Sequence, residues 1–321
     1  MRELLTLCFI LITSGSFCQT EKQLLPSDLR HQTIVTEPST LRKGYFRAGL
    51  AISHGIVDKY FTAGGHKEYG MLNSWGASSS GTLILQYGIT DRLQIESYFI
   101  YMRDIKEIQN TVYFPAADTN AYYSYDLKGR GFGDCSFSVR YQIIPEKENK
   151  LSLTGRFDLT VPTGQKNPEN IKDEFHFDPP VGYGHLDMGF HLTARKIRYP
   201  YSYSTYFAYT YKFKGHKLFD AADTEEKEFR DGARINLGGT FNVHLNDWIA
   251  LSNELNYFRF GQTKIVGIVQ EVSVPAWTIN YQPGFVFQVK RFRISEAVQV
   301  PLKGKSVAAD PMYVVIAQYT F

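Results

Sequence analysis

Tyr313-Val-Val-Ile-Ala-Gln-Tyr-Thr-Phe321 is the stretch that decides the fold. Counted back from the end, every second residue is apolar or aromatic, and these residues are Phe321, Tyr319, Ala317, Val315 and Tyr313. Side chains of a β-strand alternate between its two faces, so these residues share one face. We therefore expect a strand over 311–321 with one apolar face, of the kind that meets lipid and closes a β-barrel.

The first eighteen residues have the layout of a secretory signal peptide. Arg2 precedes an apolar run from Leu4 to Ile12, and small and polar residues follow this run up to Cys18. This order of regions predicts export, with cleavage between Cys18 and Gln19. The apolar run is about half as long as a membrane-spanning helix requires, which argues against an anchor. A lipoprotein modified at Cys18 is the other alternative, and the bulky residue before it disfavours this.

The composition after residue 18 fits alternating strands. The full chain has 22 Tyr and 23 Phe residues, which is many for an ordinary globular domain, yet its mean hydropathy is mildly polar at −0.27. No later segment contains the ~18 consecutive apolar residues that predict a transmembrane helix. A net charge of +3 gives no basis for binding nucleic acid. Cys135 is the one cysteine left after cleavage, so we expect no intramolecular disulfide.

Long segments with a two-residue period recur through the chain. In 151–161, for example, the odd positions are apolar or glycine and the even positions are polar. Such runs approach the ~9–11 residues that a tilted strand needs to cross a bilayer, whereas soluble strands usually have ~5–6. We predict about twelve strands (about 10–14). They cover 44–57, 79–89, 92–105, 132–144, 150–162, 183–197, 200–214, 231–245, 248–262, 275–290, 292–302 and 311–321.

The connections between these segments alternate between short and long. Turns such as Thr90-Asp91 and Asn246-Asp247 are short, whereas polar stretches cover 58–78, 106–131, 163–182 and 215–230, with shorter ones at 263–274 and 303–310. This alternation is typical of an up-and-down barrel with short periplasmic turns.

We therefore predict an all-β, antiparallel, monomeric transmembrane barrel over 43–321. Both termini would be periplasmic, and the strand at 44–57 would pair with the terminal strand to remove two free edges. Residues 19–42 would form a periplasmic arm or enter the lumen.

Two positions do not fit the alternation. Glu296 shares the apolar face of 292–302, where a carboxylate facing lipid is costly. A bulge, a height at the membrane interface or a misplaced strand would each explain it. Pro283-Gly284 interrupts 275–290, where the direction of the side chains would change.

Several short motifs are similar to those of one protein family. They are a hairpin with Asp-Arg in its turn, two glycine-rich strand openings and a strand end, at Leu85–Ile95, Gly131–Phe137, Gly182–Asp187 and Thr160–Gly164. They resemble the phenol-degradation meta-pathway transporter-like family of Gram-negative outer-membrane proteins, over about residues 85–190 and the terminal strand. The resemblance implies an outer-membrane barrel that passes small molecules, with apolar or aromatic ones among the candidates.

The alternation also places polar and charged side chains inside the predicted barrel. They can pair across strands and fill the interior, or they can line a water-filled pore and tune its selectivity. Both interpretations are open at this stage. The candidates are Arg47, Glu96, Arg140, Arg156, Asp158, Asp187, His191, Arg195, Lys212, Arg234 and Glu254.

Other patterns have simpler explanations than a cofactor or metal site. The glycines of 129–133 lack the strand and helix that flank a dinucleotide-binding loop, and they predict a tight turn into a strand. His185 and His191 would lie about 20 Å apart on a strand, too far to share a metal. The aromatic segment 113–125 would form the rim of an apolar binding site, part of an aromatic girdle, or a strand that extends above the membrane.

We predict a channel or transporter-like protein for small molecules, with no enzymatic activity, cofactor or metal. A twelve-strand barrel is narrower than general porins of ~16–18 strands, so slow, selective or gated passage is expected. The alternatives are a structural or surface-display barrel, and a barrel-embedded lipid hydrolase that would use Ser138, His191 and Asn242. Expected partners are outer-membrane lipid and, transiently, the barrel-assembly machinery, which would recognise the terminal strand.

Overall fold

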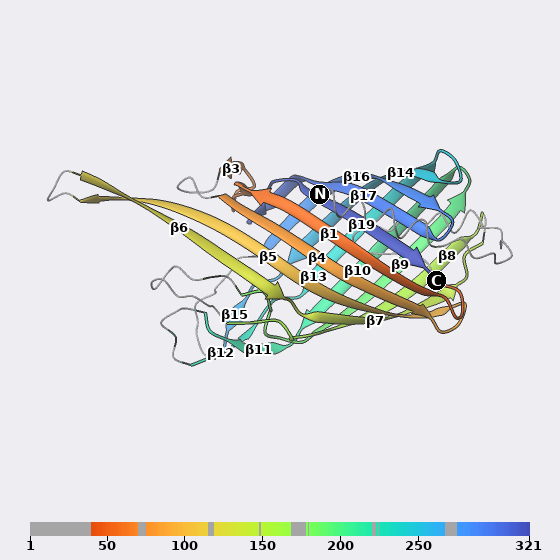
Figure 1. The fold of residues 1–321 in the computed structure, drawn as a ribbon, viewed down its shortest axis with the longest axis horizontal. Coiled ribbons are helices and arrows are strands. Elements are labelled where there is room, and N and C mark those ends of the chain that lie inside the picture. Colours follow the sequence, from red (N-terminus) through yellow and green to blue (C-terminus); the bar gives the residue numbers. More distant parts are fainter. Residues whose placement is uncertain are drawn as a thin grey trace.

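The alternating segments form antiparallel strands that run obliquely around a closed barrel (Figure 1). This computed structural model describes residues 40–69, 75–114, 119–147, 149–167, 178, 180–219, 223, 225–266 and 275–321. The predicted signal peptide (1–18), its cleavage site at Cys18 and Gln19, and most of the predicted arm (19–42) lie outside the described residues. Among the described residues, no helix is long and apolar enough to cross a membrane.

Twelve strands form the ring, as the sequence predicts. The large sheet contains 13 strands, of which β6 (Thr119–Phe132) pairs only with β5, and the other twelve close on themselves through the β4–β5 pairing. In order around the ring they are β1 (Phe46–Val57), β4 (Trp75–Gly88), β5 (Leu93–Phe114), β7 (Cys135–Ile144), β8 (Leu151–Val161), β9 (Asp187–Arg198), β10 (Tyr201–Lys212), β13 (Arg234–His244), β14 (Ile249–Phe260), β16 (Ala276–Val289), β17 (Phe292–Lys305) and β19 (Met312–Thr320).

The seam between the first and the last strand closes the barrel. β1 and β19 pair antiparallel from Arg47 opposite Thr320 to Gly55 opposite Met312. This confirms the predicted pairing of the two terminal strands, which removes both free edges of the sheet. The backbone N–H of Phe321 also donates to the carbonyl of Phe46, at 2.7 Å.

The two ends of the barrel differ in their connections. Short turns, among them 89–92 and 245–248, lie at one end, which we call the turn end, and Phe321 lies there too. The opposite end, which we call the loop end, carries the long connections and two small sheets. One sheet joins β2 (Lys59–Phe61), β3 (Lys67–Tyr69) and β18 (Val307–Ala308), and the other joins β11 (Lys214–Lys217), β12 (Lys227–Arg230) and β15 (Lys264–Ile265).

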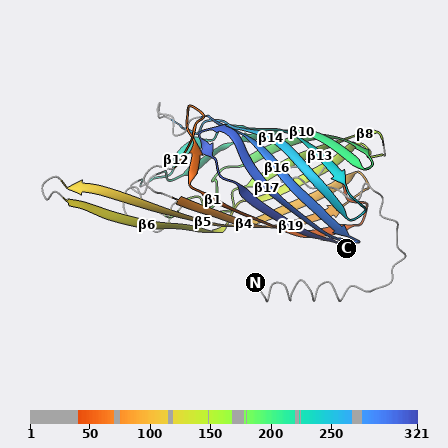
Figure 2. The same cartoon turned by 90° about the horizontal axis from the view of Figure 1, so that it is seen from above.

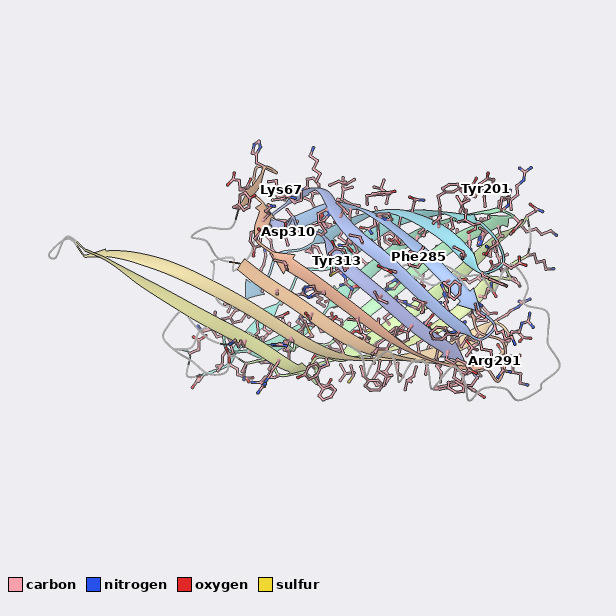
Figure 3. All side chains as sticks on the ribbon, turned by 45° about the horizontal axis from the view of Figure 1, so that its top comes forward. Lys67, Tyr201, Phe285, Arg291, Asp310 and Tyr313 are labelled. Atoms are coloured by element: carbon pink, nitrogen blue, oxygen red, sulfur yellow. The ribbon has the colours of Figure 1, made fainter. Side chains whose placement is uncertain are left out.

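Large apolar side chains cover the outer face of the ring. Each of the twelve strands exposes at least one of them. Figure 3 shows Tyr201, Phe285 and Tyr313 projecting from the outer wall. Tyr313, Val315 and Tyr319 of β19 are exposed, and so is Phe321 directly after it, so the apolar face predicted for the terminal strand is the outer face.

The segment 106–131 is not the long loop that the sequence predicts. β5 continues to Phe114, and β6 returns beside it from Thr119, so the two strands form a hairpin that extends beyond the rest of the barrel (Figures 1 and 2). The predicted tight turn at 129–133 is likewise wrong, because residues up to Phe132 belong to β6. The chain breaks its strand at Gly133 and Asp134 instead, before β7 begins at Cys135.

The two irregular positions behave differently. Pro283-Gly284 causes no change of direction, because Gln282 and Val286 are both buried on the inner face of β16. The irregularity lies at Leu302 of β17, which is skipped between the pairs formed by Ile279 and Asn280. Glu296 is exposed on the outer face, opposite Phe285 and Val315.

Candidate functional site: the barrel lumen

Polar side chains cover most of the inner face, and many of them are buried against one another. The inner positions of β14, for example, are Ser252, Glu254 and Asn256, each at most 2% exposed. The predicted lumen residues Glu96, Arg140, His191, Arg195 and Glu254 are buried, whereas Arg47, Arg156, Asp158, Asp187 and Lys212 are partly buried and Arg234 is exposed. The charged side chains gather in local clusters on neighbouring strands.

The first cluster surrounds Glu96 on β5. Arg140 on the adjacent β7 places its Nε 2.8 Å from Glu96 Oε1, and both side chains are buried. Gln94 Nε2 donates to the same carboxylate at 3.0 Å, and the hydroxyl of Tyr98 donates to its other oxygen. A buried carboxylate is stable only when it is paired and hydrogen-bonded in this way.

The second cluster surrounds Asp158 on β8. Arg156 Nε lies 2.8 Å and His191 Nε2 lies 2.5 Å from the Asp158 carboxylate, and Ser138 Oγ donates to it at 2.6 Å. Ser138 therefore bonds to the carboxylate and not to His191, so no nucleophile–base pair forms. Asn242 donates to Ser202 on β10 at 3.1 Å, away from this cluster. The three residues proposed for a hydrolase thus form no catalytic arrangement.

The third cluster joins β10 and β14 across the intervening β13. The hydroxyl of Tyr206 donates to Glu254 Oε1, and Asn256 Nδ2 lies 3.3 Å from the same oxygen. The Tyr206 ring lies flat over Gly238 of β13, where an added Cβ would meet the ring and the hydroxyl at 2.4 Å. Glycine at this position lets the ring lie along the wall of the lumen.

One part of the inner wall is apolar, which the alternation did not predict. Ile84 of β4 packs with Val314 and Ile316 of β19, and Ala51 of β1 and Met312 lie against them. The terminal strand is thus apolar on both faces over 313–316. The apolar stripe occupies β19, β1 and β4, on the opposite side of the ring from β10 and β13.

A histidine cluster lies where strands β9, β10 and β13 meet the loop end. His185 is buried between Asp187 and Asp231, with ring nitrogens 2.6 and 2.8 Å from the two carboxylates. Lys212 Nζ lies 3.5 Å from Asp231, and Thr263 Oγ1 donates to it at 2.6 Å. Burial acts to lower the pKa of His185, but the two carboxylate partners outweigh it and raise the pKa to about 9. The imidazolium therefore links the segments before β9 and β13.

The same contacts lower the pKa of Asp231, although burial acts in the opposite direction. The two histidines considered for a metal, His185 and His191, belong to separate clusters. Within the described ranges, no group of three or more His, Cys, Asp and Glu side chains is arranged to hold a metal ion.

Three of the sequence motifs meet where the strand breaks between β6 and β7. A Cβ added to Gly164 would lie 2.8 Å from the backbone of Gly133 and 2.9 Å from that of Gly182, so only glycine permits this contact. The Asp134 carboxylate accepts hydrogen bonds from the backbone N–H groups of Gly164 and Tyr183, both at 2.8 Å. We call these three glycines the glycine junction, and it fixes the β8–β9 connection to the base of the protruding hairpin.

The start of the described chain contacts the lumen at the turn end. Leu41 is buried, and its backbone N–H donates to the side chain of Gln94 at 2.5 Å. Thr40 Oγ1 donates to the carbonyl of Asp91 in the β4–β5 turn, at 2.9 Å. On another part of the same end, Arg195 lies 3.4 Å from Glu146 of the β7–β8 turn.

Solved structures with a similar fold are outer-membrane barrels. No protein-family model matches the chain, and no curated protein matches it either. The COG4313 outer membrane channel from Pseudomonas putida F1 has 15% sequence identity and a TM-score of 0.66, over 88% of this chain and 97% of that chain. The Ralstonia pickettii toluene transporter TbuX has 10% identity and a TM-score of 0.39, over 88% and 90% of the two chains.

KdgM porin has 10% identity and a TM-score of 0.44, over 85% of this chain and 99% of that chain. At 15% identity, the similarity to the COG4313 channel shows the fold alone. The chain thus shares the barrel fold of an outer-membrane channel.

Proposed function

We propose that this protein is an outer-membrane barrel whose lumen admits small molecules. The belt of exposed apolar side chains on all twelve strands supports membrane insertion, because soluble monomers rarely expose contiguous apolar patches above a few hundred Å². A closed barrel satisfies its backbone hydrogen bonds without water, as lipid requires. Short turns are periplasmic in such barrels, so both ends of the chain would lie in the periplasm.

The polar inner wall is the observation that carries the channel proposal. Its ion pairs and hydrogen bonds lie within one strand or join strands that are adjacent or one strand apart, so these contacts run along the wall. Stability alone does not require such an interior, because well-packed hydrophobic residues often replace buried ion pairs at no cost. A polar wall suits the passage of polar groups and water.

The apolar stripe supports a narrower proposal about the permeant. A molecule in the lumen would meet Ile84, Val314 and Ile316 on one side and polar side chains on the other. Small molecules with an apolar or aromatic body and a polar group match both surfaces. Tight packing of the inner side chains favours slow or gated passage.

The test is single-channel conductance of the refolded protein in a planar bilayer. We expect a small conductance that Ala51→Trp reduces, because Ala51 packs against the apolar stripe. Ala48→Trp is the matched control, since it lies on the outer face of the same strand. Addition of benzyl alcohol should interrupt the wild-type current. Absence of conductance, combined with normal uptake of small aromatic solutes in a deletion strain, would rule out a channel.

The protruding β5–β6 hairpin favours surface display as a second candidate function. It extends past the other strands at the loop end, which this orientation places outside the cell (Figure 2). Protease treatment of whole cells should then cleave the hairpin. If the protein shows no conductance and cleavage of the hairpin abolishes adhesion of the cells, the results would favour display over transport.

A further inference from the structure

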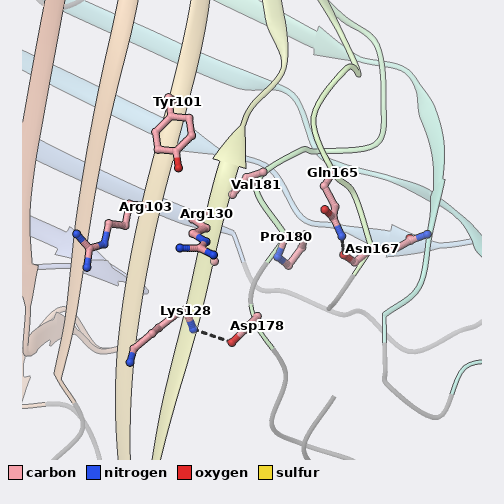
Figure 4. Close-up of a pocket in the computed structure, with 10 residues that line it drawn as sticks. Tyr101, Arg103, Lys128, Arg130, Gln165, Asn167, Asp178, Pro180 and Val181 are labelled. Atoms are coloured by element: carbon pink, nitrogen blue, oxygen red, sulfur yellow. Dashed lines mark hydrogen bonds between the residues drawn. The ribbon is translucent and has the colours of Figure 1, made fainter. Parts of the chain in front are cut away.

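A basic pocket lies at the base of the protruding hairpin. It has a volume of about 700 Å³ and lies between the β5–β6 ribbon and the β8–β9 connection (Figure 4). Arg103, Lys128 and Arg130 line one side, and Val181 and Pro180 lie on the other (Figure 4). We call this site the arginine pocket.

The two arginines oppose each other, and no acidic side chain among the described residues pairs with either of them. Arg103 of β5 and Arg130 of β6 are direct cross-strand partners, and both are exposed on the outer face. Like charges directly opposite each other destabilise a strand pair. Among the described residues, neither guanidinium forms an ion pair. Asp178 is the acidic residue of the pocket, and its carboxylate accepts from the backbone N–H of Lys128 at 2.7 Å.

The height of the pocket matches a lipid headgroup. Arg103 lies ten residues above Leu93, which corresponds to about 23 Å for a strand tilted by ~45°. That distance spans most of an apolar band ~25 Å tall. Tyr101 and Phe132, two pairs below the arginines on the same face, contact each other edge to face, with their ring centroids 5.4 Å apart. Aromatic side chains followed by cations are typical of the boundary between hydrocarbon and headgroups.

We propose that the arginine pocket binds a phosphate group, supplied by a lipid of the outer leaflet. A phosphate would neutralise the opposed guanidinium groups, whose planar donors suit bidentate contact with phosphate oxygens. The acyl chains would lie against the outer face below Tyr101. The inference rests on the proposed placement in the outer membrane, but it does not depend on conduction.

The experiment measures binding of lipopolysaccharide to the refolded barrel in detergent. The double variant Arg103→Gln/Arg130→Gln should bind about a hundredfold more weakly, since each of the two charged contacts accounts for roughly tenfold. Arg259→Gln is the matched control, because Arg259 is exposed on β14 but faces Ile235 and Trp277. Without lipopolysaccharide, the double variant should be at least as stable to urea as the wild type, since a like-charge contact is removed.

Two further probes identify the source of the phosphate. Binding of dephosphorylated lipopolysaccharide should not depend on the two arginines. Millimolar inorganic phosphate should compete only weakly with intact lipopolysaccharide. Full competition by inorganic phosphate would assign the pocket to a soluble anion and overturn the lipid source. Equal binding by the wild type and the double variant would overturn the site. If the protein forms no heat-modifiable barrel in lipid, the proposed function is wrong. If the barrel inserts normally but lipopolysaccharide binding does not depend on the two arginines, only the proposal for the pocket is wrong.

Discussion

At the scale of single residues, Glu96 and Arg140 test whether the lumen depends on paired charges. Arg140→Gln leaves a buried carboxylate with one partner fewer, and we expect a loss of about 3–5 kcal/mol in the free energy of unfolding. Glu96→Gln/Arg140→Gln together should recover much of that loss, because no unpaired charge remains. Urea unfolding midpoints of the wild type, both single variants and the double variant measure the coupling. Additive losses would show that the pair does not act as a unit.

Gly238 provides a second test at this scale. Gly238→Ala places a Cβ 2.4 Å from the Tyr206 ring, so the ring must leave the wall and its contact with Glu254. Overpacking of this kind lowers the free energy of unfolding by about 1–3 kcal/mol. Gly239→Ala is the matched control, because its nearest neighbour is a backbone oxygen at 3.5 Å. Equal unfolding midpoints for the two variants would contradict this account of Gly238.

At the scale of elements, the strands could be predicted from the sequence more readily than their contacts. The predicted segment 248–262 corresponds to β14 at Ile249–Phe260, because alternation over so many residues has one interpretation. Alternation does not reveal which strand extends above the ring, so a strand was one of three alternatives for 113–125 and its pairing as the β5–β6 hairpin was not predicted. Alternation assigned the outer face of the terminal strand correctly, but it did not predict the apolar stripe that includes Val314 and Ile316 on the inner face.

The candidate sites were less accessible to sequence reasoning. The inner charges could be predicted from side-chain direction alone, but their grouping depends on the offset between neighbouring strands. The same offset brings Arg103 opposite Arg130. The sequence motifs at Gly133, Gly164 and Gly182 gave no sign that they meet at one junction, because a glycine motif does not show which distant segment packs against it.

The His185 cluster predicts a pH dependence of the loop end. The pKa of His185 is raised from its ordinary value of 6.5 to about 9. The stability that its charged form contributes is therefore complete below pH 6.5 and is lost as pH rises through 9. We expect the free energy of unfolding to fall by an amount on the order of 1–2 kcal/mol, allowing for solvent screening. Urea unfolding from pH 6 to 10 should show this decrease. It should disappear in His185→Gln and persist in His66→Gln, which alters an exposed histidine.

The glycine junction predicts a local effect on one connection. Gly164→Ala places a Cβ within 3 Å of two backbone segments, so the β8–β9 connection must move away from the break between β6 and β7. Limited proteolysis should then cleave residues 163–186 faster than in the wild type. Gly81→Ala is a suitable control, because an added Cβ there meets no atom within 4 Å. Unchanged cleavage would show that the junction does not hold the connection.

At the scale of the whole molecule, Glu296 tests the membrane placement. It lies four residues above Phe292 on the outer face, which corresponds to about 9 Å on a tilted strand. Glu296→Gln should stabilise the barrel by up to about 2 kcal/mol in lipid vesicles, because a carboxylate facing hydrocarbon is costly. The gain should shrink in thinner bilayers that leave this position among the headgroups. Equal stability in all bilayers would argue against lipid contact at this residue.

The seam between β1 and β19 also bears on how the barrel is made. Arg47 and Thr320, which bond across it, are 273 residues apart in the chain. The pairing therefore carries the largest loop-closure entropy in the ring and cannot begin before the final strand has been synthesised. Until then the growing sheet has two unpaired edges, each able to bind another strand. We therefore expect the unfinished protein to bind a chaperone that covers open edges, whereas the finished one presents none around its ring.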